Sequence, residues 1–141
     1  MSSIKNTRIL DVLNGLPVDK TPVWIMRQAG RYLPEYKETR KKAGSFLGLC
    51  KNPDLASEVT IQPLKRFDLD AAIIFSDILT IPDAMGLELK FEDNRGPFFD
   101  KPLSNYDEVN SLDPNNIAKK LDYVANAIVE TKSKLNNAVS Y

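Results

Sequence analysis

Short apolar runs and longer helical patterns alternate along the first half of the chain. The run at residues 22–26 (PVWIM) contains large apolar and β-forming side chains and follows a proline boundary, which is typical of a buried strand. The run at residues 69–75 (LDAAIIF) has the same character. Two helical patterns lie between them: one begins at Pro34 and ends at Gly44, and the other begins at Asn52. This order of strand, helix and strand predicts a parallel pair of strands in an α/β fold.

Three further elements are expected outside this unit. A short helix follows Thr7 or Asn6, either of which can cap it. Residues 87–99 alternate between apolar and polar positions and turn at residues 93–96, which predicts a hairpin inserted after the second strand. A long helix is predicted with Asp113 as its N-cap and Pro114 at its first position. Its apolar positions have helical spacing: Ile117, Leu121, Val124, Ile128 and Leu135.

About two parallel strands with an inserted hairpin and flanking helices do not make a closed fold. Parallel strands occur almost only in sheets whose faces are covered, and open edges invite further pairing. We therefore expect residues 1–141 to be the N-terminal part of a single domain, truncated before the third strand of a (β/α)₈ TIM barrel.

Charge and composition exclude several classes of function. Lys plus Arg and Asp plus Glu both number 19, so no net positive charge attracts a nucleic acid. No apolar run reaches the ~18 residues of a membrane span, and the opening residues lack signal-peptide order, so we expect a cytoplasmic protein that does not contact membranes. The chain has no His and a single cysteine, Cys50, which we expect to be a buried apolar side chain. No metal site and no nucleotide-binding motif are expected, because neither the ligand spacings nor the glycine patterns occur.

The first candidate site directly follows the apolar run at residues 22–26. Here Arg27 and Arg31 flank Gln28, Ala29 and Gly30. Arginine carries a planar fork of donors that suits carboxylates, and the small residues allow a bulky ligand to approach the backbone. The alternative is an ordinary solvated loop that contains two arginines.

The second candidate is Asp77, which follows the apolar run at residues 69–75. A carboxylate at the mouth of an apolar barrel can accept several N–H donors and stabilise positive charge. The alternatives for Asp77 are a helix cap or a structural partner of an arginine.

Two blocks of this sequence resemble the uroporphyrinogen decarboxylase family. The block at residues 22–35 (PVWIMRQAGRYLPE) looks like the family signature, and residues 69–79 (LDAAIIFSDIL) are similar to its second strand and substrate-binding acid. Residues 62–64 (QPL) and 96–97 (GP) also fall where the family has them. The resemblance implies a distorted (β/α)₈ barrel, a homodimer and a carboxy-lyase of porphyrin and haem biosynthesis. Its reaction is the cofactor-free conversion of uroporphyrinogen III to coproporphyrinogen III, with loss of carbon dioxide from four acetate arms.

Family roles carry over only to matching positions. The resemblance implies that residues Arg27 to Arg31 line the substrate cleft, that Arg27 and Arg31 meet substrate carboxylates, and that Arg40 adds a further contact. It also implies that Asp77 accepts the pyrrole N–H groups at the centre of the macrocycle, with Arg27 and Asp77 as the catalytic pair. The Tyr, the Ser or Thr and the His that the family uses further along do not occur before Tyr141, so we expect an incomplete enzyme. Two alternatives remain: an inactive fragment, and a related corrinoid- or zinc-dependent methyltransferase barrel.

Overall fold

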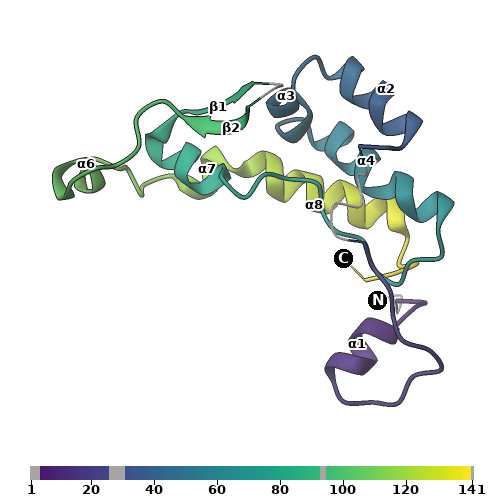
Figure 1. The fold of residues 1–141 in the computed structure, drawn as a ribbon. Coiled ribbons are helices and arrows are strands. Elements are labelled where there is room, and N and C mark those ends of the chain that lie inside the picture. Colours follow the sequence, from purple (N-terminus) through teal and green to yellow (C-terminus); the bar gives the residue numbers. More distant parts are fainter. Residues whose placement is uncertain (1–3, 26–30, 93–94, 141) are drawn as a thin grey trace.

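The computed structural model describes residues 4–25, 31–92 and 95–140. It is a mixed structure of helices and a small sheet (Figure 1). The helices are α1 (Arg8–Leu13), α2 (Pro34–Lys42), α3 (Phe46–Cys50), α4 (Pro53–Arg66), α5 (Thr80–Pro82), a π-helical turn η1 (Asp83–Leu87), α6 (Tyr106–Asn110), α7 (Ile117–Lys120) and α8 (Asp122–Leu135). The strands are β1 (Leu89–Glu92) and β2 (Gly96–Phe99).

Helix α4 is the central element, and it begins where the sequence predicts. The side chain of Asn52 accepts a hydrogen bond from the Leu55 N–H at 3.0 Å, and Pro53 occupies the first turn. One side of α4 packs along α8, and another side meets α2 and α3 (Figure 1). Helix α2 is confirmed as well, from Pro34 to the left-handed Gly44 beyond its end.

The two sides of α4 carry two separate apolar clusters. The first joins Leu33, Tyr36, Leu49 and Val59 from α2, α3, α4 and the segment before α2. The second joins residues of α4 and α8 to the extended segments at residues 69–77 and 138–140 through Ile61, Ala72, Leu135 and Val139. Ala72 and Phe75 belong to these clusters, which hold the extended segment against the helices two residues before Asp77.

The two predicted strands are extended segments that do not form a parallel ladder among the described residues. At residues 22–25 no strand is present, and the side chains of Val23 and Trp24 are 52% and 43% exposed. One backbone hydrogen bond, from the Asp70 N–H to the Val23 carbonyl at 2.8 Å, joins this segment to residues 69–77. The prediction of two buried parallel strands is wrong at this level, because parallel strands need covered faces and the side chains of Val23 and Trp24 are not covered here.

A third segment lies on the other side of residues 69–77. Ala71 and Ser140 form an isolated parallel bridge, and the Ala72 N–H donates to the Ser140 carbonyl at 2.8 Å. Residues 69–72 are therefore flanked by Val23 on one side and Ser140 on the other. The three extended segments are thus joined by single backbone hydrogen bonds and one isolated parallel bridge among the described residues.

The predicted hairpin is confirmed. Strands β1 and β2 pair antiparallel, with Leu89 opposite Phe99 and Glu92 opposite Gly96. The aromatic ring of Phe91 stacks on that of Phe46 at 4.6 Å, which anchors the hairpin on α3. Within residues 4–25, 31–92 and 95–140 this pair is the only regular sheet.

The predicted start of the last helix is wrong. The side chain of Asp113 accepts the Asn115 N–H at 2.9 Å and forms a local turn instead of a helix cap. Helix α7 begins only at Ile117, and a break at Leu121 separates it from α8. The buried face of α8 is also displaced from the predicted one: it consists of Ala127, Thr131 and Leu135, whereas Ile128 is 38% exposed.

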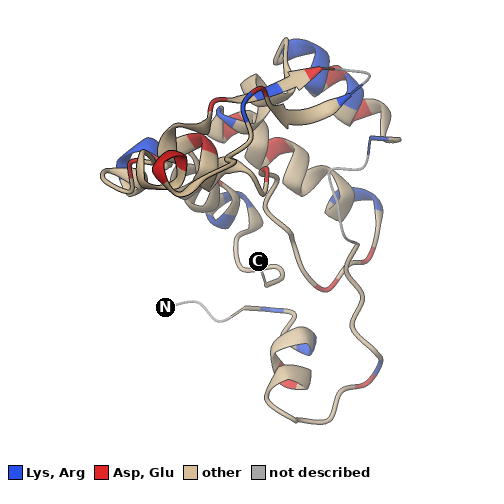
Figure 2. Ribbon diagram, turned by 60° about the vertical axis from the view of Figure 1, so that its left-hand side comes forward, with Lys and Arg blue, Asp and Glu red and all other residues tan. Residues whose placement is uncertain are grey.

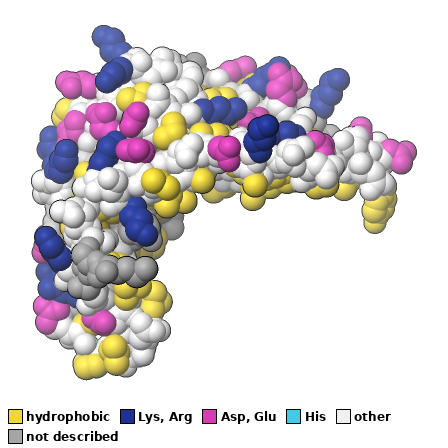
Figure 3. All heavy atoms as spheres, turned by 180° about the vertical axis from the view of Figure 1, so that it is seen from behind, with side chains coloured by type: hydrophobic (Ala, Val, Ile, Leu, Met, Phe, Trp, Pro, Cys, Tyr) yellow, Lys and Arg dark blue, Asp and Glu magenta, His cyan; other side chains and the backbone are white. Residues whose placement is uncertain are grey.

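The molecule is bent, with α1 projecting from one end and α6 from the other (Figure 1). Hydrophobic side chains gather along the inner edge of the bend (Figure 3). Positively and negatively charged residues are interspersed along the helices (Figure 2). No helix in the described ranges is both long and apolar enough to cross a membrane.

Candidate functional site

Asp77 lies where the extended segment at residues 69–77 ends and the turn before α5 begins. Its Oδ1 accepts the Leu79 N–H at 2.7 Å. The side chain is half-buried, and its Oδ2 has no hydrogen-bond partner among the described residues. The helix cap that the sequence left open is not formed, because α5 has no side-chain cap hydrogen bond; Asp77 holds the turn before α5 instead, through one carboxylate oxygen.

Asp77 shares its surroundings with a buried thiol and a cation. Burial raises the pKa of Cys50 to about 12; the negative charge of Asp77 adds to this, and Arg40 and Lys51 oppose it. Burial also raises the pKa of Tyr123, and nearby carboxylates, Asp77 among them, add to the shift. Asp77 and Arg40 therefore both act electrostatically on Cys50. The thiol itself is buried and free, as expected for an apolar side chain.

The charges of both described arginines of the candidate site, Arg31 and Arg40, act on Tyr36. The Tyr36 side chain is buried on α2, and this burial raises its pKa, whereas the charges of Arg31 and Arg40 oppose the rise. Its ring contacts Phe75 edge to face at 6.1 Å, two residues before Asp77. Tyr36 was not singled out from the sequence; its position four residues before Arg40 on one helix face was the available signal.

The predicted site residues are only partly within the described structure. Arg27, Gln28, Ala29 and Gly30 lie outside the described residues. Arg31 is exposed and Arg40 is half-buried. The charges of Arg31 and Arg40 act on the pKa of Tyr36, and those of Arg40 and Asp77 act on the pKa of Cys50.

Polar contacts between α2 and α4 hold the helix that carries Arg40. Glu35 accepts two hydrogen bonds from the Arg66 guanidinium, at 2.5 and 2.9 Å. This pairing lowers the pKa of Glu35, mainly through the side-chain hydrogen bond. Deeper in the interface, the hydroxyl of Thr39 donates to Glu58 at 2.8 Å and accepts from the Gln62 side chain at 3.0 Å.

A second carboxylate, Asp70, has a structural role that sequence reasoning missed. Its residue is 2% exposed. Oδ1 accepts hydrogen bonds from Asn6 at 2.8 Å and Arg8 at 2.9 Å, and Oδ2 accepts the Val23 N–H at 2.7 Å. Burial alone would raise the pKa of Asp70, but these hydrogen bonds hold it below its usual value. An acid inside an otherwise apolar run was the signal for such a role.

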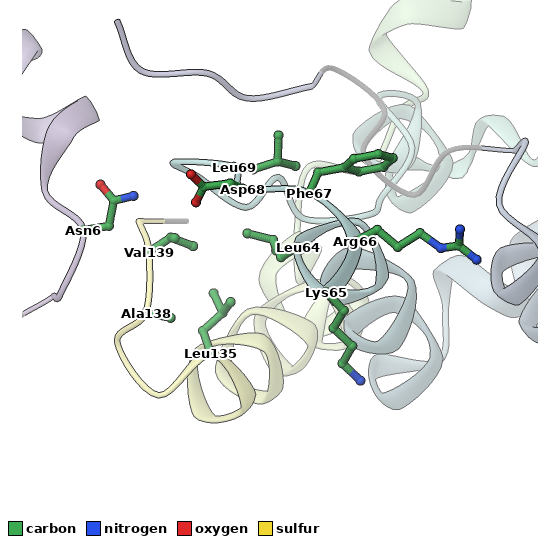
Figure 4. Close-up of a pocket in the computed structure, with 10 residues that line it drawn as sticks. All are labelled: Asn6, Leu64, Lys65, Arg66, Phe67, Asp68, Leu69, Leu135, Ala138 and Val139. Carbon is green, nitrogen blue, oxygen red and sulfur yellow. The ribbon is translucent and has the colours of Figure 1, made fainter. Parts of the chain in front are cut away.

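Two cavities in the structure lie away from these residues. One, of about 510 Å³, is floored by Leu64, Leu69, Leu135 and Val139 at the start of the segment that Asp77 ends (Figure 4). The other, of about 340 Å³, lies beside α1. Neither is lined by Arg31, Arg40 or Asp77. In the described part of the chain, no three or more Cys, Asp or Glu side chains are grouped to hold a metal ion.

Comparison with known structures defines the class of fold. The structure resembles a methyltransferase from Methanosarcina mazei with a TM-score of 0.70, over 94% of this chain and 39% of that one. The sequences are 24% identical, so this likeness concerns the fold alone.

Sequence comparison gives the family. The uroporphyrinogen decarboxylase (URO-D) family model matches residues 4–141. Curated proteins named uroporphyrinogen decarboxylase are 58% identical in Nitrosomonas europaea and Pseudoalteromonas atlantica and 55% identical in Hydrogenovibrio crunogenus, each over 139 residues. The chain belongs to the uroporphyrinogen decarboxylase family, as its two blocks predict. The matches cover 99% of the chain but 39% of each relative's length.

Proposed function

We propose that this chain supplies the N-terminal part of a uroporphyrinogen decarboxylase and carries one half of its tetrapyrrole site. The observation that carries the proposal is the family match over residues 4–141, at 55% to 58% identity to proteins of that name. The complete enzyme converts uroporphyrinogen III to coproporphyrinogen III as a cytoplasmic homodimer without a cofactor. The 141 residues match 39% of the length of these relatives, so the activity is proposed for the complete enzyme and not for this part alone.

The substrate side chains account for the arginines. Uroporphyrinogen carries acetate and propionate arms, so its rim is a ring of carboxylates. Arg31 is exposed, and Arg27 to Gly30 precede it directly in the chain. The guanidinium group of an arginine at this position is permanently charged and can bind a carboxylate through two parallel hydrogen bonds. Arg40 adds a second positive charge, which also acts on Tyr36.

The chemistry accounts for Asp77. Protonating a pyrrole carbon makes the ring cationic, and this ring takes up the electron pair that the departing carbon dioxide leaves behind. An anionic carboxylate at the ring centre stabilises the cation as it develops, which lowers the barrier instead of merely binding substrate. Asp77 suits this role because its Oδ1 is fixed by the Leu79 N–H while the side chain is only half-buried. Arg27 has a pKa too high for an efficient proton donor, so we assign it to substrate orientation.

The incomplete parallel pairing fits the first part of a (β/α)₈ barrel. Segments 22–25, 69–77 and 138–140 lie in that order through Val23, Asp70, Ala71 and Ser140. In a barrel these would be the first two strands and the start of the third, which begins earlier than the sequence predicts, and further strands would cover the exposed side chains of Val23 and Ile73. Asp77 then lies at a strand's carboxyl end, where such barrels place their active sites.

A chimaera tests the proposal. Residues 4–141 replace the matching part of the Nitrosomonas europaea enzyme, and decarboxylation of uroporphyrinogen III is followed by separating the products. We expect the chimaera to be active and Asp77→Asn to lower its turnover by roughly 10² to 10³, the loss typical of one electrostatic stabiliser. A folded Asn variant with near-normal turnover would remove Asp77 from the mechanism. An inactive but folded chimaera would contradict the proposal as a whole.

A further inference from the structure

The backbone immediately before Asp77 is held by a side chain of α4. The Phe75 N–H donates to the Thr60 hydroxyl oxygen at 2.9 Å, and the same hydroxyl donates to the Ala56 carbonyl at 2.8 Å. Thr60 is 0% exposed, so no solvent competes for this hydroxyl. The chain of hydrogen bonds thus runs from the extended segment through one hydroxyl into the backbone of the central helix.

This contact replaces the one that a neighbouring strand would supply. Residues 72–77 form no regular strand, so the Phe75 N–H takes its acceptor from a helix side chain. The ring of Phe75 is fixed as well, because it contacts Tyr36 at 6.1 Å and Phe46 at 5.7 Å. Two residues further on, Asp77 turns the chain by accepting the Leu79 N–H. The place of its carboxylate follows from where Phe75 is held.

We propose that Thr60 is a positioning residue for Asp77: its buried hydroxyl fixes the end of the extended segment and thereby the carboxylate. The functional meaning of this position rests on the proposed tetrapyrrole site. The positioning itself concerns only groups that the structure describes, and it can be measured without a ligand.

The chain contains a matched control on the helix that faces α4. Thr131 of α8 is also 0% exposed, but its hydroxyl has no hydrogen-bond partner among the described residues. Thr60→Val and Thr131→Val remove the same group from equally buried sites. Only Thr60→Val leaves a backbone N–H without its acceptor. Thr60→Ser makes the opposite change at the same site: it keeps the hydroxyl and removes the methyl group.

The first readout is the NMR signal of the Leu79 amide in the full 141-residue chain. This N–H donates to Asp77 Oδ1 at 2.7 Å, so its chemical shift reports the geometry of that hydrogen bond. We expect Thr60→Val to move this signal, whereas Thr60→Ser and Thr131→Val leave it unchanged. The inference is overturned if Thr60→Val leaves the signal unchanged, or if Thr131→Val moves it equally. If the valine variant does not fold, a folded serine variant that has lost the signal overturns it too.

The second readout is binding of uroporphyrin III, followed by the quenching of its fluorescence. In Thr60→Val we expect the dissociation constant to rise about threefold to tenfold, the equivalent of one hydrogen bond, with wild-type binding in Thr131→Val. Unchanged binding in Thr60→Val alongside a moved Leu79 signal would contradict the functional meaning of the position. If the wild-type chain itself shows no saturable binding, the site proposed for this chain fails, and the Leu79 amide alone decides the role of Thr60.

Discussion

Two carboxylates on one extended segment, Asp70 and Asp77, have opposite surroundings. Asp70 is buried and accepts hydrogen bonds from Asn6, Arg8 and the Val23 backbone, which come from two other parts of the chain. Asp77 is half-buried and accepts one hydrogen bond from its own turn. Asp70 and Asp77 are seven positions apart in the sequence. Both carboxylate oxygens of Asp70 accept hydrogen bonds, whereas Oδ2 of Asp77 has no hydrogen-bond partner among the described residues.

The difference shows how a single run of sequence can serve both stability and chemistry. An acid that already binds several donors has its charge balanced and gains little from a ligand. An acid held at one oxygen keeps its orientation and can still respond to a developing positive charge. Neither alternative that the sequence left open for Asp77, a helix cap or a structural partner of an arginine, is seen among the described residues: Asp77 holds a turn, and the partner of an arginine on this segment is Asp70.

The largest expected effect is the loss of stability when Asp70 is neutralised. Asp70→Asn removes a buried negative charge from beside Arg8 and leaves at least one donor unpaired, which should lower the free energy of unfolding by about 3 kcal/mol. Urea denaturation followed by circular dichroism measures it. Asp19→Asn is the matched control, because Asp19 binds the same guanidinium from an exposed position, and we expect a much smaller loss. Equal losses in the two variants would abolish the distinction between buried and exposed partners.

The same carboxylate should make the fold sensitive to acid. The pKa of Asp70 is lower in the folded chain than in the unfolded one, so its contribution is complete above its ordinary pKa of roughly 4 and is lost as the pH falls through the folded value. Asp19, whose pKa is lowered to about 2 mainly by its hydrogen bond with Arg8, adds a loss in the same direction. We expect the melting temperature to fall steeply below pH 4, and less steeply in Asp70→Asn. Parallel curves for the two proteins would show that Asp70 is not the responsible group.

A smaller effect is expected when Arg31 of the candidate site is replaced. Arg31→Lys keeps the charge but not the planar fork, so uroporphyrin III binding in the chimaera should weaken about tenfold, the loss of one charged hydrogen bond. Lys37→Arg on the neighbouring helix serves as a control for general changes in surface charge. Wild-type affinity in Arg31→Lys would indicate that Arg31 belongs to an ordinary solvated loop and does not bind the substrate.

The smallest expected effect is that of Asp77 on stability. Because Asp77→Asn retains a side-chain oxygen that can accept the Leu79 N–H, it should change the free energy of unfolding by at most about 1 kcal/mol. Thermal melting of the 141-residue chain measures it beside Asp70→Asn. A loss as large as that of Asp70→Asn would make Asp77 a structural residue like its neighbour.

Local signals in the sequence predicted the elements whose bonds are local. Asn52 and Pro53 mark the start of α4, Gly44 follows the end of α2, and the alternation at residues 87–99 predicts the hairpin. Asp113 has equally strong capping chemistry, yet its side chain forms a short turn, because two local hydrogen-bonding patterns compete at such residues. Helix α3 was not predicted; its five residues are too few to show a period.

Features that depend on distant partners could not be predicted in the same way. The apolar run at residues 22–26 has the composition of a strand, but whether it forms one depends on neighbours far along the chain. For the same reason the sequence shows that Asp70 is an acid among apolar residues, but not that Asn6, Arg8 and Val23 surround it. The candidate site was predicted from its arginines and Asp77, whereas Tyr36 emerged only when α2 was placed beside residue 75.

The bridge between Ala71 and Ser140 also bears on the order in which the chain folds. Its two residues are separated by nearly half the sequence, so closing it costs more chain entropy than forming any helix turn. Helices α2 and α4 and the hairpin can form from neighbouring residues, whereas the extended segments must wait until α4 and α8 have docked. During this interval the edges of residues 69–77 are unprotected, and they are the part of a nascent chain that would gain most from a chaperone.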